Sequence, residues 1–474
     1  MMRGDPKSRA ALVFVMVAFV IMLVPFVGML WAPTVSTSEN RELADAPSLV
    51  DENGAPNLNM LADWGAYFED HFAYRNELVA SNAALRSLLG VSSTDQVVLG
   101  TDGWLYYGGT LADYLGKNEL SDRALFNIAH SLSMLQNYVH SRGAEFVLAI
   151  APNKNSLYPE HMPSYYLATP NASNWERLKP LLDKEGVAYV DLFEVLGNAE
   201  SRLYYLRDSH WTNKGALLAA NALLAALGRA PIEAPDGSWI ERDDWLGDLE
   251  SMLHPVWATA EPAVYTEGIN DGDSMSGSRW GYTVGSDVTD DEIETVGPGG
   301  GRLLMYRDSF GNALLPYLST AFRGVRFSKL IPYNALEIDR FDADCVVVER
   351  AERHLEYLAY EPAIMPSPRL RDAIVSPTDG ASQALTLEIA ERGPFYELTG
   401  ELDASAVSPN CRIAIAVRSA DGSDTVYEAI PVSLGDQGDD GHWSGGSDYG
   451  YRAYVHREAM DPTTDEIIVF SLER

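Results

Sequence analysis

Apolar residues run without interruption near the start of the chain. Residues 10–31 contain no charged side chain, and Arg3, Lys7 and Arg9 stand before or at the edge of them. An apolar run of this length can span a bilayer, and a basic flank favours the cytoplasmic side. We therefore predict a single-pass anchor in the cell membrane, with a cytoplasmic N-terminus and the rest of the chain extracytoplasmic. A cleavable signal peptide is the alternative.

Helical and strand-like apolar spacings alternate beyond residue 61. Ser121 is expected to cap a helix that runs to about residue 140, and a second helix from Asn174 should end at Gly186. The expected strands are residues 146–150, 187–190, 325–327, 344–349 and a run from 303 that stops at Ser309. This succession predicts an α/β fold, with a parallel sheet flanked by helices. Ligands of such sheets bind beyond the carboxyl ends of the strands.

The pattern also predicts the domain boundaries. Residues 1–33 would form the cytoplasmic tip and anchor, 34–60 a juxtamembrane linker, and 61–362 the main domain. Residues 231–301 read as an acidic, irregular insertion with scattered aromatics such as Trp280. Residues 363–474 alternate as short strands between turn residues and predict a smaller all-β module, resembling a sandwich. Its Trp443, Tyr449 and Tyr451 are candidates for carbohydrate binding, and a bracing role is the alternative.

Composition narrows the possible partners. The chain has 35 basic and 68 acidic side chains, a formal net charge of −33, which disfavours nucleic acid and bulk anionic polymers. Five basic residues against one acid lie between residues 301 and 336, which would suit an anionic sugar or form a solvated basic face. The two cysteines leave one disulfide possible, although Cys345 reads as a buried thiol.

Two short stretches carry candidate chemistry. Asp208 and His210 stand two residues apart before an alanine- and leucine-rich helix, and Ser309 follows an apolar strand at a turn before a probable helix. A carboxylate that orients an imidazole, together with a serine at a strand-to-helix turn, is typical of acyl-transfer catalysis. Each stretch alone favours a helix N-cap over catalysis. Together they favour a Ser-His-Asp site.

Further residues near these stretches are candidates for substrate binding. They lie after expected strands, beside the candidate histidine or in an aromatic loop: Lys154, Trp211, Trp245, Arg307 and Arg353. Glu352 could instead hold Arg353 in a structural ion pair. The histidines lack metal-ligand spacing, and the glycine run at 297–301 lacks the features of a phosphate loop, so we expect neither a metal nor a bound cofactor.

The ordered motifs resemble a known family. The stretch Asp-Ser-His-Trp-Thr-Asn-Lys-Gly at residues 208–215 and Arg-Asp-Ser-Phe-Gly-Asn at 307–312 resemble motifs of the alginate O-acetyltransferase-like (DHHW) proteins, which carry an SGNH-hydrolase-like domain. Segments at 39–44, 67–75, 100–107, 152–160 and 244–249 agree with the same family. Ser209 departs from the pattern, because relatives often have a second histidine there.

The resemblance implies an activity. It maps the catalytic triad to Ser309, His210 and Asp208, and it implies transfer of acetyl groups to a polysaccharide through an acetyl-serine. The acetyl donor would be a co-substrate rather than a cofactor, and a multi-spanning membrane acyltransferase would supply it. A polysaccharide acetylesterase with the same triad is the alternative enzyme, and a non-catalytic scaffold of a polysaccharide modification or export complex is the alternative outside enzymes.

Overall fold

A seven-stranded sheet forms the centre of the chain, in the order β4-β3-β11-β9-β10-β8-β7. The computed structural model describes residues 6–33, 43–50, 55–88, 94–234, 239–254, 257–266, 282–284, 291–370, 382–438 and 442–472. Arg3, residues 34–42 and 51–54 of the expected linker, and Trp280 lie outside them. The strands of the sheet are β4 (Tyr189–Val190), β3 (Glu145–Ala151), β11 (Cys345–Ala351), β9 (Arg302–Tyr306), β10 (Gly324–Ser328), β8 (Glu292–Val296) and β7 (Thr283–Val284).

The strands from β4 to β10 run parallel, and β8 and β7 extend the sheet antiparallel. The helices of the domain are α4 (Leu111–Tyr114), α5 (Asp122–Ser141), α6 (Lys154–Leu157), α7 (Asn174–Glu185), α8 (Leu192–Gly197), α9 (Asn213–Ala226), α10 (Asp248–Leu253), α11 (Leu315–Ala321), α12 (Glu337–Phe341) and α13 (Tyr357–Tyr360). Short 3₁₀ turns join them: η1 (Gly108–Thr110), η2 (Pro159–His161), η3 (Phe310–Ala313) and η4 (Glu352–His354).

Helices cover both faces of the sheet because its strands are apolar on both sides. Successive side chains of a strand point to opposite faces, so Phe146 and Leu148 of β3 pack with α5, α7 and α12. Val147 and Ala149 of the same strand pack with α8, α9 and α11 on the other face. The expected parallel sheet between helices is therefore what the structure contains.

Local sequence signals account for several boundaries. The Ser121 side chain accepts a hydrogen bond from the Ala124 amide at the start of α5, and Gly186 ends α7 at φ 71°. The strands β1 (Val97–Leu99) and β2 (Leu105–Tyr107) form a hairpin, as the Asp-Gly pair between two apolar runs predicts. Its turn places Asp102 at φ 55° and Gly103 at φ 79°, the conformation that an Asp-Gly pair favours.

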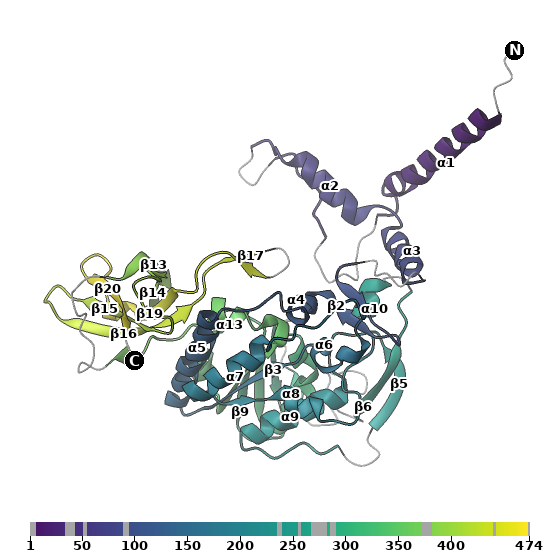
Figure 1. Cartoon of the computed structure of the whole chain (residues 1–474). Helices are drawn as coiled ribbons and strands as arrows, with labels where there is room; N and C mark the ends of the chain where they lie inside the picture. The colour runs from purple at the N-terminus through teal and green to yellow at the C-terminus, as the bar shows by residue number, and fades with distance from the viewer. Residues whose placement is uncertain are drawn as a thin grey trace.

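The segment expected to be an irregular insertion is more ordered than its composition indicates. Strands β5 (Trp239–Trp245) and β6 (Glu261–Thr266) pair as an antiparallel ribbon, seen at the right of Figure 1. β7 and β8 of the same segment join the main sheet instead. The side chains of β8 alternate between exposed and buried, which a count of acidic residues does not reveal.

The prediction of a membrane anchor is wrong. The helix α1 (Pro6–Gly28) projects from the rest of the chain in Figure 1 and ends before the apolar run does. Within the described residues, none of the helices combines the length and the apolar character needed to cross a bilayer. This finding overturns the transmembrane element of the expected fold class, the membrane-anchored state and the single-pass location. Two further helices, α2 (Met60–His71) and α3 (Arg75–Leu88), precede the main domain.

The C-terminal residues form a curled antiparallel sheet, a half-barrel rather than the expected sandwich. Its strand order is β13-β14-β19-β16-β15-β20, with β12 paired to β16. The strands are β12 (Arg369–Leu370), β13 (Ala384–Arg392), β14 (Phe395–Leu402), β15 (Arg412–Arg418), β16 (Asp424–Val432), β19 (Gly450–His456) and β20 (Glu466–Leu472). A two-stranded ribbon of β17 (Asp436–Gln437) and β18 (Trp443–Ser444) and the turn η5 (Arg457–Ala459) complete the module.

The aromatic candidates for carbohydrate binding in this module are packed against protein. Trp443 stacks on Tyr360 of α13 with ring centroids 4.5 Å apart, and Tyr451 is fully buried. The Tyr449 ring lies 5.0 Å from the guanidinium of Arg123. These positions favour the bracing role. Cys411 of this module and Cys345 of the main sheet are both buried and free.

Helix α5 of the main domain lies beside the C-terminal module (Figure 1), and buried polar contacts join the two. Arg123 donates to the backbone oxygens of Pro409 and Cys411, at 3.2 and 2.8 Å. About two turns further along, the His130 ring lies 2.9 Å from Glu185 of the main domain and 3.0 Å from Glu428 of β16. Burial alone would lower the pKa of His130, but hydrogen bonds to the two carboxylates raise it above its usual value.

We predict that His130 stabilises the fold in a pH-dependent way. A histidine whose pKa is raised by folding contributes its full stability below the unfolded pKa, and that contribution disappears as the pH rises through the folded pKa. Replacing His130 with alanine should therefore cost about 2 kcal/mol of unfolding free energy near pH 6, and less near pH 9. Denaturant unfolding at both pH values measures the difference.

His140→Ala is the matched control, because His140 is exposed on the last turn of the same helix. It should change the unfolding free energy little at either pH. An equal loss for His130→Ala at both pH values would contradict the charged bridge between the domains.

Candidate active site

The segment 203–212 brings Asp208 and His210 to the carboxyl edge of the sheet. The apolar run 203–206 at its start is strand-like in sequence, but it pairs through a single bridge between Tyr204 and Trp211. Thr212, rather than Asp208, caps α9, accepting from the Gly215 amide at 3.3 Å. The Asp208 carboxylate instead accepts the backbone N–H of His210 at 2.9 Å, a local turn that places both side chains on one side of the chain.

Ser309 lies just after β9, at the start of η3, and its side chain makes no capping bond there. The Ser309 side chain therefore does not act as a helix cap. Its position is fixed by the preceding residue, because the Asp308 carboxylate accepts the amides of Phe310 and Ala351 at 2.9 and 2.7 Å. His354 adds a contact of 3.0 Å to the same carboxylate.

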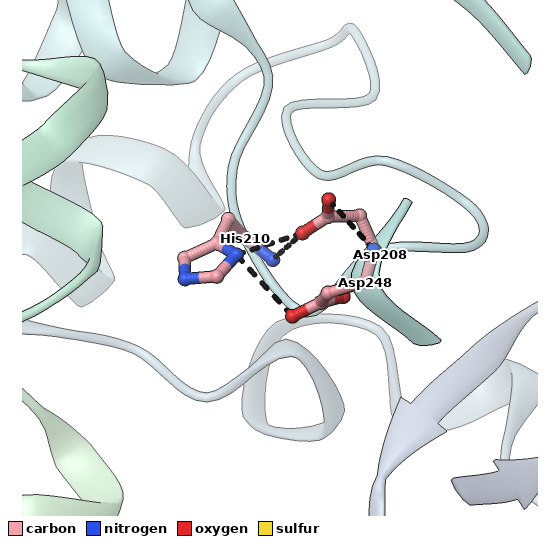
Figure 2. Close-up of side chains that lie close together, drawn as sticks. All are labelled: Asp208, His210 and Asp248. Atoms are coloured by element: carbon pink, nitrogen blue, oxygen red, sulfur yellow. Dashed lines mark hydrogen bonds and ion pairs between the residues drawn. The ribbon is translucent and has the colours of Figure 1, made fainter. Parts of the chain in front are cut away.

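The three candidate residues form one hydrogen-bonded chain. The Ser309 hydroxyl lies 2.9 Å from His210 Nε2, and His210 Nδ1 lies 2.7 Å from Asp208 Oδ1. A carboxylate only accepts, so Nδ1 carries the proton and Nε2 is left to accept the serine hydroxyl. Figure 2 shows the Nδ1 side of the ring facing the carboxylates of Asp208 and Asp248, with the other nitrogen turned away from them.

A set of fixed donors keeps Asp208 ionised although it is only 3% exposed. Its second oxygen accepts the Trp245 indole N–H at 3.0 Å and the Asp248 amide at 3.3 Å. Burial alone would raise its pKa, but the charge and hydrogen bonds of His210 and the Asp248 amide lower it to about 2. The carboxylate is therefore charged at any ordinary pH.

The same pair raises the pKa of His210. Burial opposes protonation of the ring, but the Asp208 charge and hydrogen bond outweigh it, and Asp248 adds a smaller attraction. Asp248 Oδ2 lies 3.6 Å from Nδ1 and accepts the Ser209 hydroxyl at 2.5 Å. Burial and the Asp208 charge raise the pKa of Asp248. The imidazole is thus prepared to receive a proton from the serine.

The hydrogen-bonded chain opens on a cavity of about 640 Å³. The lining residues come from the 205–213 segment, from β5 to α10, from β6 and from η3: Tyr205, Asp208, His210, Trp211, Asn213, Arg242, Asp244, Trp245, Leu246, Asp248, Tyr265, Ser309, Phe310, Asn312, Ala313 and Pro316. The cavity is large enough for a sugar unit beside the serine.

Of the expected substrate-binding residues, Trp211 and Trp245 line the cavity. Trp211 is 1% exposed and packs edge-on against Phe310, whereas Trp245 is partly exposed and also holds Asp208. Lys154 is buried and does not reach the cavity. It donates to the backbone oxygens of Leu105, Leu206 and Asp208, at 2.6, 2.7 and 3.0 Å. Burial lowers its pKa to about 7, while three acceptors for three N–H groups favour the charged form.

The two expected arginines lie behind the serine rather than in the cavity. Arg307 is fully buried and donates to Asn312 Oδ1 at 2.5 Å. Arg353 lies against the far side of the site, with its guanidinium 5.4 Å from the Phe310 ring. The expected ion pair between Glu352 and Arg353 is not formed: Glu352 accepts from Asn153 and Ser156 instead.

Sequence reasoning missed Asp248 and Asn312 as parts of this site. Asp248 lies in a segment that was singled out, residues 244–249, but nothing in its local pattern shows that its amide and carboxylate reach Asp208 and Ser209. Asn312 belongs to the serine motif. Because Arg307 can only donate, it fixes the Asn312 carbonyl oxygen and turns the amide nitrogen away from the guanidinium.

Asp208, His210 and Asp248 could also be considered as metal ligands, since their ligand atoms lie within 4.8 Å of one another. Two ligands of one tetrahedral zinc, each about 2 Å from the ion, stand roughly 3.3 Å apart. The 2.7 Å separation of Asp208 Oδ1 and His210 Nδ1 is that of a hydrogen bond. The observed arrangement therefore fits a proton between these atoms, and an ion would have to separate them.

The different contributions of Asp208 and Asp248 predict how substitutions at these positions change the pKa of His210. Asp208→Asn should lower the pKa of His210, because the charge and the hydrogen bond that favour the imidazolium are both removed. Asp248→Asn should lower it less, since Asp248 is further from Nδ1. NMR titration of ¹³C-labelled histidine, with His210→Gln to assign the signal, measures both shifts.

Asp243→Asn is the matched control, because Asp243 carries the same charge on β5 and is not among the residues lining the cavity. It should leave the His210 pKa almost unchanged. A larger shift for Asp248→Asn than for Asp208→Asn would contradict the assignment of Asp208 as the partner of the ring.

Comparison with known proteins agrees with the motifs. Residues 97–270 match the model of the SGNH hydrolase-like domain of the acetyltransferase AlgX. The chain is 30% identical over 197 residues to the probable alginate O-acetylase AlgJ of Pseudomonas syringae pv. tomato, covering 40% of this chain and 49% of that protein. AlgJ of Pseudomonas aeruginosa is 26% identical over 195 residues, with coverage of 40% and 49%. The chain spans about half the length of these curated relatives.

Solved structures resemble the chain more distantly. PatB1 of Bacillus cereus with a sulfonyl adduct is 16% identical and covers 56% of this chain and 98% of its own, with a TM-score of 0.42. The O-acetyltransferase domain of Pseudomonas putida AlgJ is 19% identical, covers 55% and 92%, and has a TM-score of 0.35. The family match confirms the resemblance found in the sequence motifs: residues 97–270 are similar to the SGNH hydrolase-like domain of the alginate O-acetyltransferases.

Proposed function

We propose that this protein is an O-acetyltransferase that transfers acetyl groups to hydroxyls of a polysaccharide, with Ser309 as nucleophile. The observation that carries the proposal is the chain Ser309–His210–Asp208, with separations of 2.9 and 2.7 Å, at the wall of a cavity. A serine activated by an oriented imidazole is the arrangement that acyl transfer requires. The match of residues 97–270 to an acetyltransferase domain supports this reaction over other serine chemistry.

The first half of the reaction loads the serine. His210 Nε2 takes the Ser309 proton as Oγ attacks the carbonyl carbon of an acetyl donor. The new Oγ–C bond forms, the bond from the acetyl carbon to the donor breaks, and His210 returns the proton to the departing donor group. Asp208 stays ionised and stabilises the imidazolium while it exists, as its low pKa allows.

The second half transfers the acetyl group. A sugar hydroxyl enters the cavity, His210 Nε2 removes its proton, and the oxygen attacks the acetyl-serine. The sugar–acetyl bond forms as the Ser309 Oγ–C bond breaks, and His210 returns the proton to Oγ. The fold of the cavity wall must therefore favour a sugar hydroxyl over water at this position, or the outcome is ester hydrolysis.

Donors around Ser309 are available for the developing oxyanion. The Phe310 amide is occupied by Asp308 at 2.9 Å. Within the described residues, the Ser309 and Gly311 amides have no acceptor, and the Asn312 amide nitrogen is turned away from Arg307. We assign these groups to the oxyanion hole, where preorganised donors stabilise the charge of the tetrahedral intermediate.

The proposal includes an acetyl donor as co-substrate and no cofactor. The resemblance to the family is the basis for proposing a multi-spanning membrane acyltransferase as the partner that supplies the acetyl group. Nothing in the cavity resembles a built site for a nucleotide-containing donor, since one arginine, Arg242, is the only cation among its lining residues and it is paired with Asp244. A small donor, or an acetyl group delivered on a partner protein, fits this wall better.

The proposal predicts that Ser309 and His210 act as one unit. Ser309→Ala and His210→Ala should each reduce acetyl transfer from an activated acetyl ester to a glycan by on the order of 10⁴-fold or more, and the double variant should lose little beyond either. A sulfonyl fluoride should label Ser309, and more slowly in His210→Ala. Product analysis by mass spectrometry and peptide mapping provide the measurements.

Ser156→Ala is the control for the serine, because Ser156 follows a strand of the same sheet and donates to Glu352 at 2.6 Å but does not line the cavity. It should transfer at a normal rate. Rapid acetate release from an acetylated glycan without transfer would establish an esterase, and undiminished transfer by Ser309→Ala would exclude the proposed mechanism. No reaction in any assay would favour the scaffold.

A further inference from the structure

The wall of the active-site cavity carries more negative than positive charge. Among the described residues, three carboxylates line it, those of Asp208, Asp244 and Asp248, against the single guanidinium of Arg242. With the His210 imidazole neutral, as the base that accepts the Ser309 proton must be, two carboxylates stand against one cation even if Asp248 is protonated. The chain as a whole has a net charge of −33, so the surrounding field adds to this local excess rather than offsetting it.

The one cation in the wall is already committed to a carboxylate. Arg242 Nη2 is in direct contact with Asp244 Oδ2, and its guanidinium lies 4.7 Å from the Tyr265 ring. The Tyr265 hydroxyl donates to the other oxygen of Asp244 at 2.9 Å. A carboxylate on a substrate would have to break this arrangement to gain a partner, and it would leave Asp244 without its cation.

The basic residues between 302 and 329 do not change this balance, because none of them is among the lining residues. Arg307 is buried and donates to Asn312, and Arg326 pairs with Glu294 and Glu337 on β8 and α12, at 3.0 and 2.5 Å. Arg353 is not among the lining residues, and its guanidinium lies 5.4 Å from the Phe310 ring. The less repulsive field that the sequence indicated around Ser309 is therefore not presented to a substrate.

Apolar side chains also line the cavity, next to these charges in the chain. Trp245 is partly exposed and stacks on the buried Tyr205 ring, with centroids 4.4 Å apart and an angle of 6° between the rings. The adjacent Leu246 is 54% exposed. Flat aromatic and aliphatic surfaces of this kind pack against the C–H face of a sugar ring, which needs no charge on the sugar.

We infer that the acceptor glycan is built of uncharged sugars, carrying hydroxyl or N-acetyl groups, and is not a polyuronate. The inference rests on the proposed function. A uronate next to the accepting hydroxyl would bring its carboxylate beside Asp208 and Asp244 in a partly desolvated cavity without an available cation, and like charges placed together in this way discriminate strongly against a ligand. An uncharged sugar can pack against Trp245 and Leu246 and donate hydroxyl groups to the carboxylates without this charge repulsion.

The test compares acceptors of equal length with the full chain and one activated acetyl ester. An uncharged β-linked hexasaccharide should accept acetyl with a kcat/KM at least about tenfold above that of a mannuronate hexasaccharide. Added salt should raise kcat/KM for the mannuronate acceptor, because it screens the repulsion, and should leave the uncharged acceptor nearly unaffected. Equal use of both acceptors, or a preference for the uronate, would overturn the inference.

Charge variants locate the effect in the cavity. Asp244→Asn removes one carboxylate and releases Arg242, so it should raise the ratio of uronate to uncharged acceptor use several-fold. Asp243→Asn makes the same change of net charge at the neighbouring position of β5, outside the lining, and should leave the ratio unchanged. The same ratio change in both variants would assign the preference to overall charge and overturn the role of the wall.

The failure of this inference is distinguishable from failure of the proposed function. Acetylation of the enzyme by the donor ester is measured first, without acceptor. If the enzyme is acetylated and the uronate is preferred, the transferase proposal stands and the inference about the acceptor is wrong. If neither acceptor receives acetyl from an enzyme that hydrolyses the ester, the transferase proposal itself fails, and the acceptor inference falls with it.

Discussion

The site depends on holding the buried Asp208 carboxylate in its charged form. A carboxylate that is 3% exposed pays a large desolvation cost, and only fixed donors can offset it. The donors are the backbone and ring of His210, the Trp245 indole and the Asp248 amide. They come from two segments about 40 residues apart, so the buried anion has all of its donors only when the β5–α10 region is folded onto the 203–212 segment. Removing one donor would weaken the orientation of the imidazole as well as the charge.

Close backbone approach makes this docking possible. Gly247 precedes α10, and a Cβ at this position would lie 2.2 Å from the Arg207 carbonyl oxygen, so only glycine lets the Asp248 amide reach Asp208. On the serine side, a Cβ at Gly311 would lie 2.7 Å from the Arg307 side chain. Lys154 fixes the other side of the 203–212 segment. Its ammonium donates to a backbone oxygen of β2 and to the backbone oxygens on both sides of Arg207. Small residues and one buried cation thus set the positions of the reacting groups.

Local sequence patterns predicted what local physics determines. Ser121, Gly186 and the Asp102–Gly103 turn act within a few residues, and the Asp208–His210 pair is itself a short-range turn. Contacts between distant segments could not be predicted from the sequence. Lys154 was predicted to bind substrate, because its three carbonyl partners come from other parts of the chain. The role of Asp248 and the pairing of Arg242 with Asp244 depend on the same long-range fold. Strand β19 lies next to a glycine-rich stretch, and it forms by pairing with β14 and β16. The apolar periodicity of the sequence does not specify this pairing or the half-barrel that results from it.

The central claim is that Ser309 carries the acetyl group between donor and glycan. The most direct measurement is peptide mapping by mass spectrometry of the full chain after brief reaction with an acetyl ester and acid quenching, with and without an acceptor glycan. The account predicts an acetyl group on the peptide containing Ser309 that accumulates without acceptor and disappears when the glycan is added. An enzyme that acetylates glycan at its full rate while Ser309 stays unmodified, or while the acetyl group resides on another residue, would contradict it.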